Sequence, residues 1–406
     1  MRHIAHLLLL NIIVLLSALF GLISCTQHKD GWKSSIQVVD GVTLVKNPDS
    51  PLNPELKIIF EEDLTIGVKG GDENYMFGSQ VFLTTDEEGS FYVTDGDRKV
   101  VKKYDVNGRF LQSIGRPGQG PGEFQTISAA RFDGKGNIYL NDVSNQRISF
   151  LSREGRYLKG IRVPFLLEGV VINSKGLHIG RSADNVRLGK GKRWDYFYGL
   201  FDDRFNLAAE FLRLPQEAQV FKNFGSAAQV FADYLSSMAF TPSVNYVLDQ
   251  NDLLYFGYSQ DYEIKVFSSE GKLLKRIQRD FKPVEIDKRH KEYFVQNLSE
   301  QTLAKMPPGE EEEVFELIRY PKYLPAYERF TLMENGWIFV VVDSVRVEYK
   351  LVDIFNREGE YLAQFETDIP TDWLSFNNGK AYSVATKDDY KFIKRYNFDI
   401  LGYTGN

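Results

Sequence analysis

The sequence is very poor in cysteine and histidine, and both shortages exclude common kinds of site. Its 406 residues contain one cysteine, Cys25, and five histidines. Beyond residue 30 the only histidines are His178 and His290. The folded body therefore cannot build a zinc site from three histidines of one chain. It also cannot form an internal disulfide, because that needs a second cysteine.

The chain also lacks an excess of basic charge. Its formal net charge is −6, its isoelectric point is about 5.6, and its densest positive cluster is the short segment 190–194. A nucleic-acid partner would require a basic face, so none is predicted. Neither a Gly-x-Ser-x-Gly nucleophile motif nor a phosphate-binding Gly-rich loop occurs. We therefore predict no catalytic residue, no cofactor-binding residue and no cofactor. A calcium-type divalent ion stays open, and its ligands are unknown because 55 acidic residues give too many candidates.

Long apolar runs are also scarce, and the single strong one lies at the N-terminus. Residues 7–23 are apolar and follow a short head that contains Arg2, which is typical of a secretory signal. The tetrapeptide 22–25, Leu-Ile-Ser-Cys, resembles the lipobox of bacterial lipoproteins, in which the cysteine is lipidated and becomes the mature N-terminus. We expect a signal peptide over 1–24, lipidation of Cys25 and a polar tether over 25–54. The alternative is an uncleaved membrane anchor, for which 17 residues is the lower limit.

These features predict a location and one partner. Acyl chains on Cys25 would hold the protein on a membrane, because each buried methylene contributes about 0.8 kcal/mol. We expect a lipid-anchored protein of the cell envelope, attached to the outer membrane, with its periplasmic or surface face left open. The membrane is thus one partner, and an envelope protein or a glycan is the candidate for a second.

A two-part phrase recurs six times along the rest of the chain. The first part, a Gly or Asp followed by aromatic or β-branched residues, begins at Gly89, Gly136, Gly176, Asp252, Gly336 and Gly379. The second part opens another apolar stretch, and in three copies it follows the first by the same 19 residues. When two insertions, 213–237 and 282–324, and a long third hairpin are set aside, the copies repeat every 40–47 residues. That period, made of short strands, is typical of the four-stranded blade of a β-propeller.

The fold prediction is an all-β, six-bladed propeller over 55–406 with four-stranded antiparallel blades and a small helical insertion. Alternating apolar residues, as in 137–141 and 147–151, indicate strands, because no 3.6-residue period is present. An open ring would leave unpaired sheet edges. We expect 55–68 to close the ring as the outer strand of the last blade. The abundant Phe and Tyr residues are expected to fill the spaces between blades.

The connection 115–124, GRPGQGPGEF, adds a family resemblance. Together with Asp142, Asn145, Arg147 and Ile148 it is similar to the NHL-type repeat. With the lipobox and the six copies, the mature chain resembles six-bladed β-propeller lipoproteins of Bacteroides-like bacteria. The resemblance implies a fold and hardly any function. Because the Asp142, Asn145 and Arg147 pattern recurs in shortened form at 95–98, we interpret it as scaffold: the Asp closes a turn, and the Arg pairs with it across the hairpin.

The two insertions break the repeat and are where a specific function is expected. Residues 285–305 and 310–318 have helical patterns separated by Pro307-Pro308, so we predict a helical hairpin on one rim, with 225–236 as a shorter companion. It either shields the rim or forms a lid or binding surface. We predict a non-catalytic module that binds a ligand or a protein. The alternative is a metal-dependent hydrolase or lyase with its site in the central channel.

Overall fold

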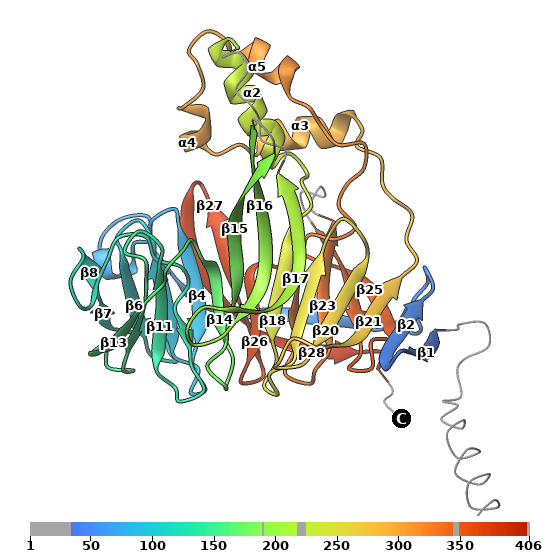
Figure 1. Cartoon of the computed structure of the whole chain (residues 1–406), viewed down its shortest axis with the longest axis horizontal. Helices are drawn as coiled ribbons and strands as arrows, with labels where there is room; N and C mark the ends of the chain where they lie inside the picture. Colours follow the sequence, from blue (N-terminus) through green and yellow to red (C-terminus); the bar gives the residue numbers. More distant parts are fainter. Residues whose placement is uncertain (1–33, 189–190, 217–224, 344–348, 404–406) are drawn as a thin grey trace, which may run out of the picture. The chain divides into compact units, whose positions relative to one another are not determined.

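The computed structural model describes residues 34–188, 191–216, 225–343 and 349–403. Six blades, each with four antiparallel strands, form a ring, which confirms the predicted six-bladed β-propeller (Figure 1). The blades are numbered here in chain order. Blade 1 comprises β4 (Val81–Thr85), β5 (Phe91–Asp95), β6 (Val100–Tyr104) and β7 (Phe110–Ile114). Blade 2 comprises β10 (Arg131–Phe132), β11 (Ile138–Asp142), β12 (Arg147–Leu151) and β13 (Tyr157–Arg162). Blade 3 comprises β14 (Glu168–Ile172), β15 (His178–Leu188), β16 (Gly191–Phe201) and β17 (Leu207–Gln216).

The other three blades complete the ring. Blade 4 comprises β18 (Val244–Leu248), β19 (Leu254–Tyr258), β20 (Glu263–Phe267) and β21 (Leu273–Arg279). Blade 5 comprises β22 (Arg329–Leu332), β23 (Ile338–Asp343), β24 (Lys350–Phe355) and β25 (Tyr361–Thr367). Blade 6 comprises β26 (Asp372–Asn377), β27 (Lys380–Lys387), β28 (Tyr390–Leu401) and β3 (Lys57–Ile66). The first strands of successive blades touch one another, as β18 touches β22 and β22 touches β26. These strands therefore surround the axis of the ring.

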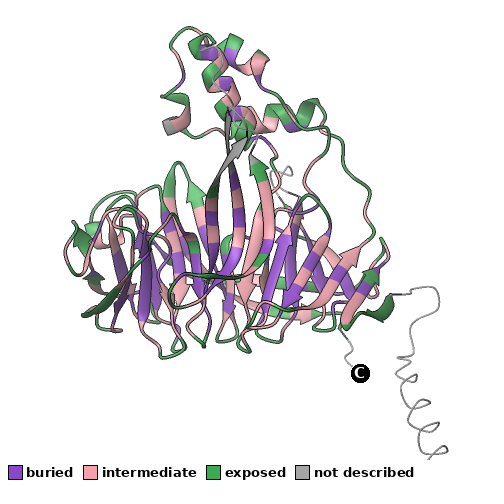
Figure 2. Ribbon diagram, in the orientation of Figure 1, coloured by how far each residue is buried: buried purple, intermediate pink, exposed green. Residues whose placement is uncertain are grey.

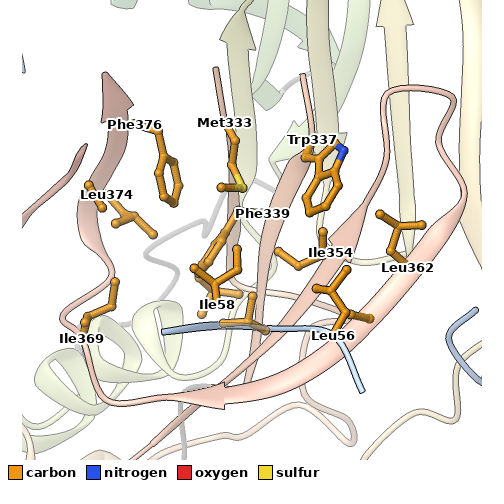
Figure 3. Close-up of a cluster of buried hydrophobic side chains, with 14 of the residues drawn as sticks. Leu56, Ile58, Met333, Trp337, Phe339, Ile354, Leu362, Ile369, Leu374 and Phe376 are labelled. Carbon is orange, nitrogen blue, oxygen red and sulfur yellow. The ribbon is translucent and has the colours of Figure 1, made fainter. Parts of the chain in front are cut away.

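The ring closes as predicted. β3, which precedes blade 1 in sequence, pairs antiparallel with β28 and becomes the outer strand of blade 6. Leu56 and Ile58, beside and within β3, are almost fully buried in a cluster with Phe339 and Phe376 from blades 5 and 6 (Figure 3). Strands from the N-terminal and C-terminal parts of the chain thus share one sheet, and β28 is not left as an unpaired edge.

The recurring second-phrase glycines are required by backbone conformation and by contact between blades. Gly155 has φ 78°, which favours glycine in the turn between β12 and β13. A Cβ placed there would also lie 2.9 Å from Cγ1 of Ile114, on the outer strand of blade 1. A Cβ placed at Gly359 would likewise come too close to the side chain of Ile277, on the outer strand of blade 4. The repeat therefore preserves glycine where a hairpin lies against the preceding blade.

Aromatic side chains fill the boundaries between blades, as expected from the composition. Phe91 of blade 1 meets Tyr382 of blade 6 edge to face, with ring centroids 5.5 Å apart. Phe211 of blade 3 packs on Phe256 of blade 4 in a tilted arrangement, with ring centroids 5.7 Å apart. Figure 2 shows the buried residues running along the strands of the blades, with exposed residues at loops and on the helices.

The polar tether predicted over 25–54 is wrong for its described part. Residues Ser35–Val39 (β1) and Val42–Asn47 (β2) form a hairpin through Asp40 and Gly41, both with positive φ. β2 pairs in parallel with β21, so blade 4 carries two additional strands. Alternating Val and Ile residues favour a strand, and we overlooked them because turn-forming residues surround them. The predicted signal peptide and Cys25 lie outside the described residues.

The insertions contain helices, although the predicted hairpin is partly wrong. The helices are α2 (Ala227–Met238), α3 (Lys288–Gln296), α4 (Glu300–Leu303) and α5 (Glu311–Leu317), and a short 3-10 turn, η1 (Glu73–Tyr75), precedes blade 1. The single helix expected over 285–305 is divided, because Asp287 caps α3 at one end and Asn297 ends it at the other. α2, expected to be the shorter companion, is the longest described helix and packs against α5. We call α2 to α5 the helical cap.

The helical cap has its own small hydrophobic core. Ala228, Ala232 and Leu235 of α2 are fully buried against Val314 of α5 and Met306. The segment that leads into α3 and the segment that follows α5 are hydrogen-bonded to each other, since Leu324 N donates to Val284 O at 2.9 Å. None of the helices in the described part of the chain is long and apolar enough to cross a membrane.

Candidate functional site

Asp142, the most conspicuous residue of the recurring pattern, serves the scaffold. Its carboxylate accepts hydrogen bonds from the backbone amides of Gln125 and Thr126, each at 3.0 Å, and from the Asn145 side chain at 2.6 Å. Asp142 is fully buried at the end of β11. Its hydrogen-bonding capacity is thus used to hold the chain segment that enters blade 2.

Arg147 also serves the scaffold, but the predicted pairing with Asp142 is wrong. Its guanidinium donates to the carbonyl oxygens of Gln119 (2.8 Å), Gly120 (2.7 Å) and Glu123 (2.5 Å). These carbonyls belong to the Gly-rich connection 115–124, where β8 (Arg116–Pro117) and β9 (Glu123–Phe124) pair in parallel. Arg147 therefore fastens this connection to blade 2, because a planar guanidinium can reach several acceptors at once.

In blade 1 the corresponding acidic residue does pair with an arginine, as predicted. The buried carboxylate of Asp95 accepts from Arg98 Nη1 at 2.8 Å and from the amide of Gly78 at 3.1 Å. Asp97 accepts from the amide and hydroxyl of Ser79. The recurring acidic residues of blades 1 and 2 thus fix loops and do not form a common site.

The two histidines of the body occupy separate places. His178 begins β15, is 2% exposed and stacks on Phe205 with ring centroids 4.8 Å apart, and burial lowers the pKa of its imidazole. His290 lies in α3, where its Nδ1 is 2.6 Å from Asp287 Oδ1 in the helix cap. Within the described ranges, no three His, Cys, Asp or Glu side chains are grouped closely enough to hold a metal ion.

A cavity of about 430 Å³ lies on the axis of the ring, and we call it the channel cavity. Residues from the first strands of five blades line it, so it is the central channel of the propeller. Its polar lining combines charged, amide and hydroxyl groups: Thr84, Arg131, Asn245, Glu328, Arg329, Thr331 and Thr371. Such a mixture suits recognition of a polar ligand by several directed contacts.

Two of the three charged residues that line the channel cavity are paired. Arg329 Nη1 lies 2.8 Å from Asp372 Oδ1, and Glu328 Oε1 lies 3.6 Å from Lys350 Nζ. The third residue, Arg131 of β10, makes no side-chain hydrogen bond or ion pair with any described residue. It is half-buried, so its guanidinium is partly removed from water without an anion beside it.

A large aromatic side chain also borders the same cavity. Trp373 of β26 lines the channel cavity, is 39% exposed and meets Phe82 edge to face, with centroids 4.9 Å apart. Its φ of 55° is unusual for a bulky residue, and the pairing of β26 with β27 shifts register between Asp372 and Ser375. The bulge thus re-aims a large aromatic side chain at the channel, as bulges near functional sites often do.

A second cavity adjoins the channel cavity on the side of the helical cap. This cavity, the cap groove, measures about 530 Å³ and shares Ser243, Glu328 and Arg329 with the channel cavity. Its other wall comes from the cap, including Phe240, Tyr293 and Phe294. In Figure 1 the cap stands over one rim of the propeller on that side. The insertion thus builds a wall of the groove and does more than shield a blade edge.

A third cavity, the lateral cleft, adjoins the cap groove. It measures about 640 Å³ and lies between α3 and blades 4 and 5, with Tyr293 and Leu324 lining both cavities. Its wall includes Arg279, which is clamped between the rings of Tyr262 and Tyr361 at 5.2 and 4.4 Å. Arg279 Nη1 lies 2.6 Å from Asp353 Oδ2, and burial raises the pKa of Asp353. This buried pair holds the boundary of the two blades rigid.

A calcium-type site is not favoured by the acidic groups at the channel. Calcium takes six to eight oxygen ligands, usually including several carboxylates. The carboxylates of Glu328 and Asp372 each lie beside a lysine or arginine, and no third one joins them in the described part of the chain.

The sequence did not indicate Arg131 or Trp373. Both lie on the first strand of a blade, and these strands face the axis of a propeller. A charged or large aromatic residue on a first strand was the available signal. We missed it because the recurring phrases begin at the second strands, such as β11.

Comparison with known proteins agrees with the architecture. Residues 79–253 match the family model DUF5128, described as a 6-bladed beta-propeller. No curated protein matches the sequence. The chain is similar in structure to a candidate exported protein of Bacteroides fragilis NCTC 9343, with TM-score 0.51, 11% identity, and coverage of 88% of this chain and 99% of that one.

Two further solved structures are similar to the chain at low sequence identity. A member of the duf4221 family from Bacteroides vulgatus ATCC 8482 has TM-score 0.51 and 10% identity, covering 86% of this chain and 99% of its own. Virginiamycin B lyase from Staphylococcus aureus has TM-score 0.42 and 8% identity, covering 84% and 99%. At these identities the likeness concerns the fold alone. The chain is a six-bladed β-propeller.

Proposed function

We propose that the protein is a lipid-anchored propeller of the cell envelope that binds a ligand or partner at the channel cavity and cap groove without catalysing a reaction. The observation that carries the proposal is that these two neighbouring cavities share three lining residues, Ser243, Glu328 and Arg329. A ligand seated there would contact both the propeller and the helical insertion. Insertions in repeat proteins commonly build the binding face.

The lining favours binding over chemistry. Arg329 and Glu328 already lie beside opposite charges, which leaves neither positioned as an isolated acid or base. Threonine, serine and asparagine side chains supply directed hydrogen bonds, and Trp373 supplies a flat apolar surface. Ligand sites of this composition fix the orientation of a bound molecule.

Envelope attachment is supported by two separate considerations. The apolar run 7–23 and the lipobox-like segment ending at Cys25 indicate export and lipidation. The similar protein from Bacteroides fragilis carries a name that describes it as exported. Mass spectrometry of the mature N-terminus tests this part: we expect a lipidated Cys25, and an unmodified Cys25 on an uncleaved signal segment would contradict it.

Binding is tested with a glycan array and a crosslinking pull-down from envelopes, using the full chain. The variant Tyr293→Ala alters both the cap groove and the lateral cleft, and we expect it to weaken capture by roughly tenfold, as loss of an aromatic contact commonly does. Tyr234→Ala is the matched control, because Tyr234 is on the same cap and 48% exposed. Equal loss in both variants, or no loss in either, would contradict the proposed site.

The metal-dependent hydrolase or lyase remains the alternative, and metal analysis of the purified chain separates it from binding. A stoichiometric divalent ion with ligands in the channel cavity would favour the enzyme. The acidic residues of the channel give this alternative no ligand set in the described ranges.

A further inference from the structure

Arg131 is the unusual charge of the channel cavity. It begins β10, a two-residue strand held to β11 by pairing of Arg131 with Tyr139. The next residue, Phe132, packs toward blade 1, with its ring centroid 5.0 Å from that of Tyr92. Arg131 lies on the opposite side of the strand, because neighbouring side chains of a strand alternate, and it lines the channel cavity.

No anion compensates Arg131 among the described residues. Glu168, on the first strand of the next blade, is held by Arg181 through Nε at 2.9 Å. Asp133, two positions along the chain, accepts from the side chain of Asn137 and from nearby backbone amides. Both acidic residues are therefore engaged elsewhere, and the part of the chain that the structure describes supplies no anion for the guanidinium.

The surroundings of Arg131 are not those of an ordinary solvated surface charge. Tyr246 is partly buried, which raises the pKa of its hydroxyl, and the positive charge of Arg131 opposes that rise. Tyr246 lines the same cavity and donates to Gly169 O at 2.6 Å. Partial burial of an unpaired cation is unfavourable, and a bound anion would remove that cost.

The remaining charges limit what kind of anion fits. Glu328 lines the same cavity, and Asp372 adjoins it beside Arg329. A dianion such as phosphate would meet these carboxylates, whereas a single carboxylate matches the one uncompensated guanidinium and can form two parallel hydrogen bonds with it. Trp373 offers a partly exposed aromatic face in the same cavity, against which a ring can pack.

We propose that the ligand of the channel cavity is a ring compound carrying one carboxylate, such as a sugar acid, and that Arg131 binds this carboxylate while Trp373 packs on the ring. The inference deepens the proposed function and rests on it. Asn245 and Thr331 line the same cavity and supply polar groups for the ring substituents.

The test uses the full chain with two probes that differ only at one carbon, glucuronate and glucose, titrated by calorimetry or by ligand-observed NMR. We expect glucuronate to bind at least about tenfold more tightly than glucose. Arg131→Gln should abolish that preference. Arg156→Gln is the matched control, because Arg156 is 81% exposed on a hairpin turn and should leave the preference unchanged. Equal binding of the two sugars, an unchanged preference in Arg131→Gln, or no binding of glucuronate up to about 50 mM would overturn the inference.

A thermal measurement checks the same point and shows whether the variant folds. Arg131→Gln should melt at or above the temperature of the parent chain, because it removes an uncompensated charge. Benzoate, a ring carboxylate, should raise the melting temperature of the parent chain and not that of Arg131→Gln. Equal shifts in both would contradict the assignment. If the glycan array returns a neutral glycan that Arg131→Gln still binds, this inference fails while the proposed function survives; if nothing binds at the two cavities, both fail.

Discussion

Replacing Arg279 with methionine would leave a carboxylate buried without its cation at the boundary of blades 4 and 5. Asp353 is fully buried and accepts from Arg279 Nη1 at 2.6 Å, from Tyr361 Oη at 2.9 Å and from Gln364 Nε2 at 2.8 Å. Methionine keeps most of the side-chain volume between the two tyrosine rings. The substitution therefore removes charge and hydrogen bonds more than packing.

The expected loss is large. Removal of one partner of a buried ion pair typically costs about 3–5 kcal/mol, compared with about 0–1 kcal/mol for an exposed pair. Lys175→Met supplies the exposed control, because Lys175 and its partner Glu270 are 51% and 61% exposed. Arg279→Met should thus lower the free energy of unfolding several times more than Lys175→Met.

The loss should also depend on pH in a defined direction. Burial raises the pKa of Asp353 in the folded chain, and Arg279 opposes that rise. Without Arg279 the folded pKa rises further above the unfolded value. A group of this kind contributes stability below its unfolded pKa and loses it as pH rises through the folded pKa. The destabilisation by Arg279→Met should therefore be greatest at neutral pH and shrink in acid.

Urea unfolding of the two variants and the parent chain, followed by circular dichroism at neutral and acidic pH, measures both effects. A midpoint that falls no further for Arg279→Met than for Lys175→Met would refute the reasoning. A loss that is the same at both pH values would refute the assignment of its origin to a buried unpaired carboxylate.

Three further outcomes are expected. Gly155→Ala should lower the free energy of unfolding by about 1–3 kcal/mol. Gly176→Ala should lower it less, because Gly176 has the same φ of 78° but no heavy atom within 4 Å of the added Cβ. Equal losses in the two variants would show that contact with Ile114 does not matter. Ile58→Ala should lower the free energy of unfolding, measured with urea, by about 2–5 kcal/mol. Ile59→Ala should lower it little, because the Ile59 side chain is 47% exposed. A larger loss for Ile59→Ala would contradict the closure of the ring by β3. Purified protein should contain no stoichiometric divalent metal by elemental analysis, and chelator should not change its melting temperature; a bound equivalent of metal would favour the enzyme.

The architecture could be predicted from the sequence because each blade repeats the same local requirements. Positive-φ glycines such as Gly155, and turn-closing acids such as Asp142, recur at fixed spacing. The closing strand was predictable because an unpaired edge is unfavourable. The β1–β2 hairpin was not, since its parallel pairing with β21 joins segments 232 residues apart, as Thr43 and Lys275 illustrate.

The candidate site was much less accessible to sequence analysis. The motif residues Asp142, Asn145 and Arg147 stand out in the sequence but fix loops. Arg131 and Trp373 carry no motif, and their importance depends on which blades surround the axis and on which charges remain unpaired. Such information arises only when first strands from distant parts of the chain are brought together.

Hydrogen–deuterium exchange of the full chain, with and without the ligand returned by the array or pull-down, tests the central claim most directly. If the ligand lies in the channel cavity and cap groove, exchange should slow in β18, β22 and α3, whose residues line the two cavities. The outer strands β7 and β13 should exchange unchanged. Protection confined to outer strands or to the β1–β2 hairpin would contradict the account.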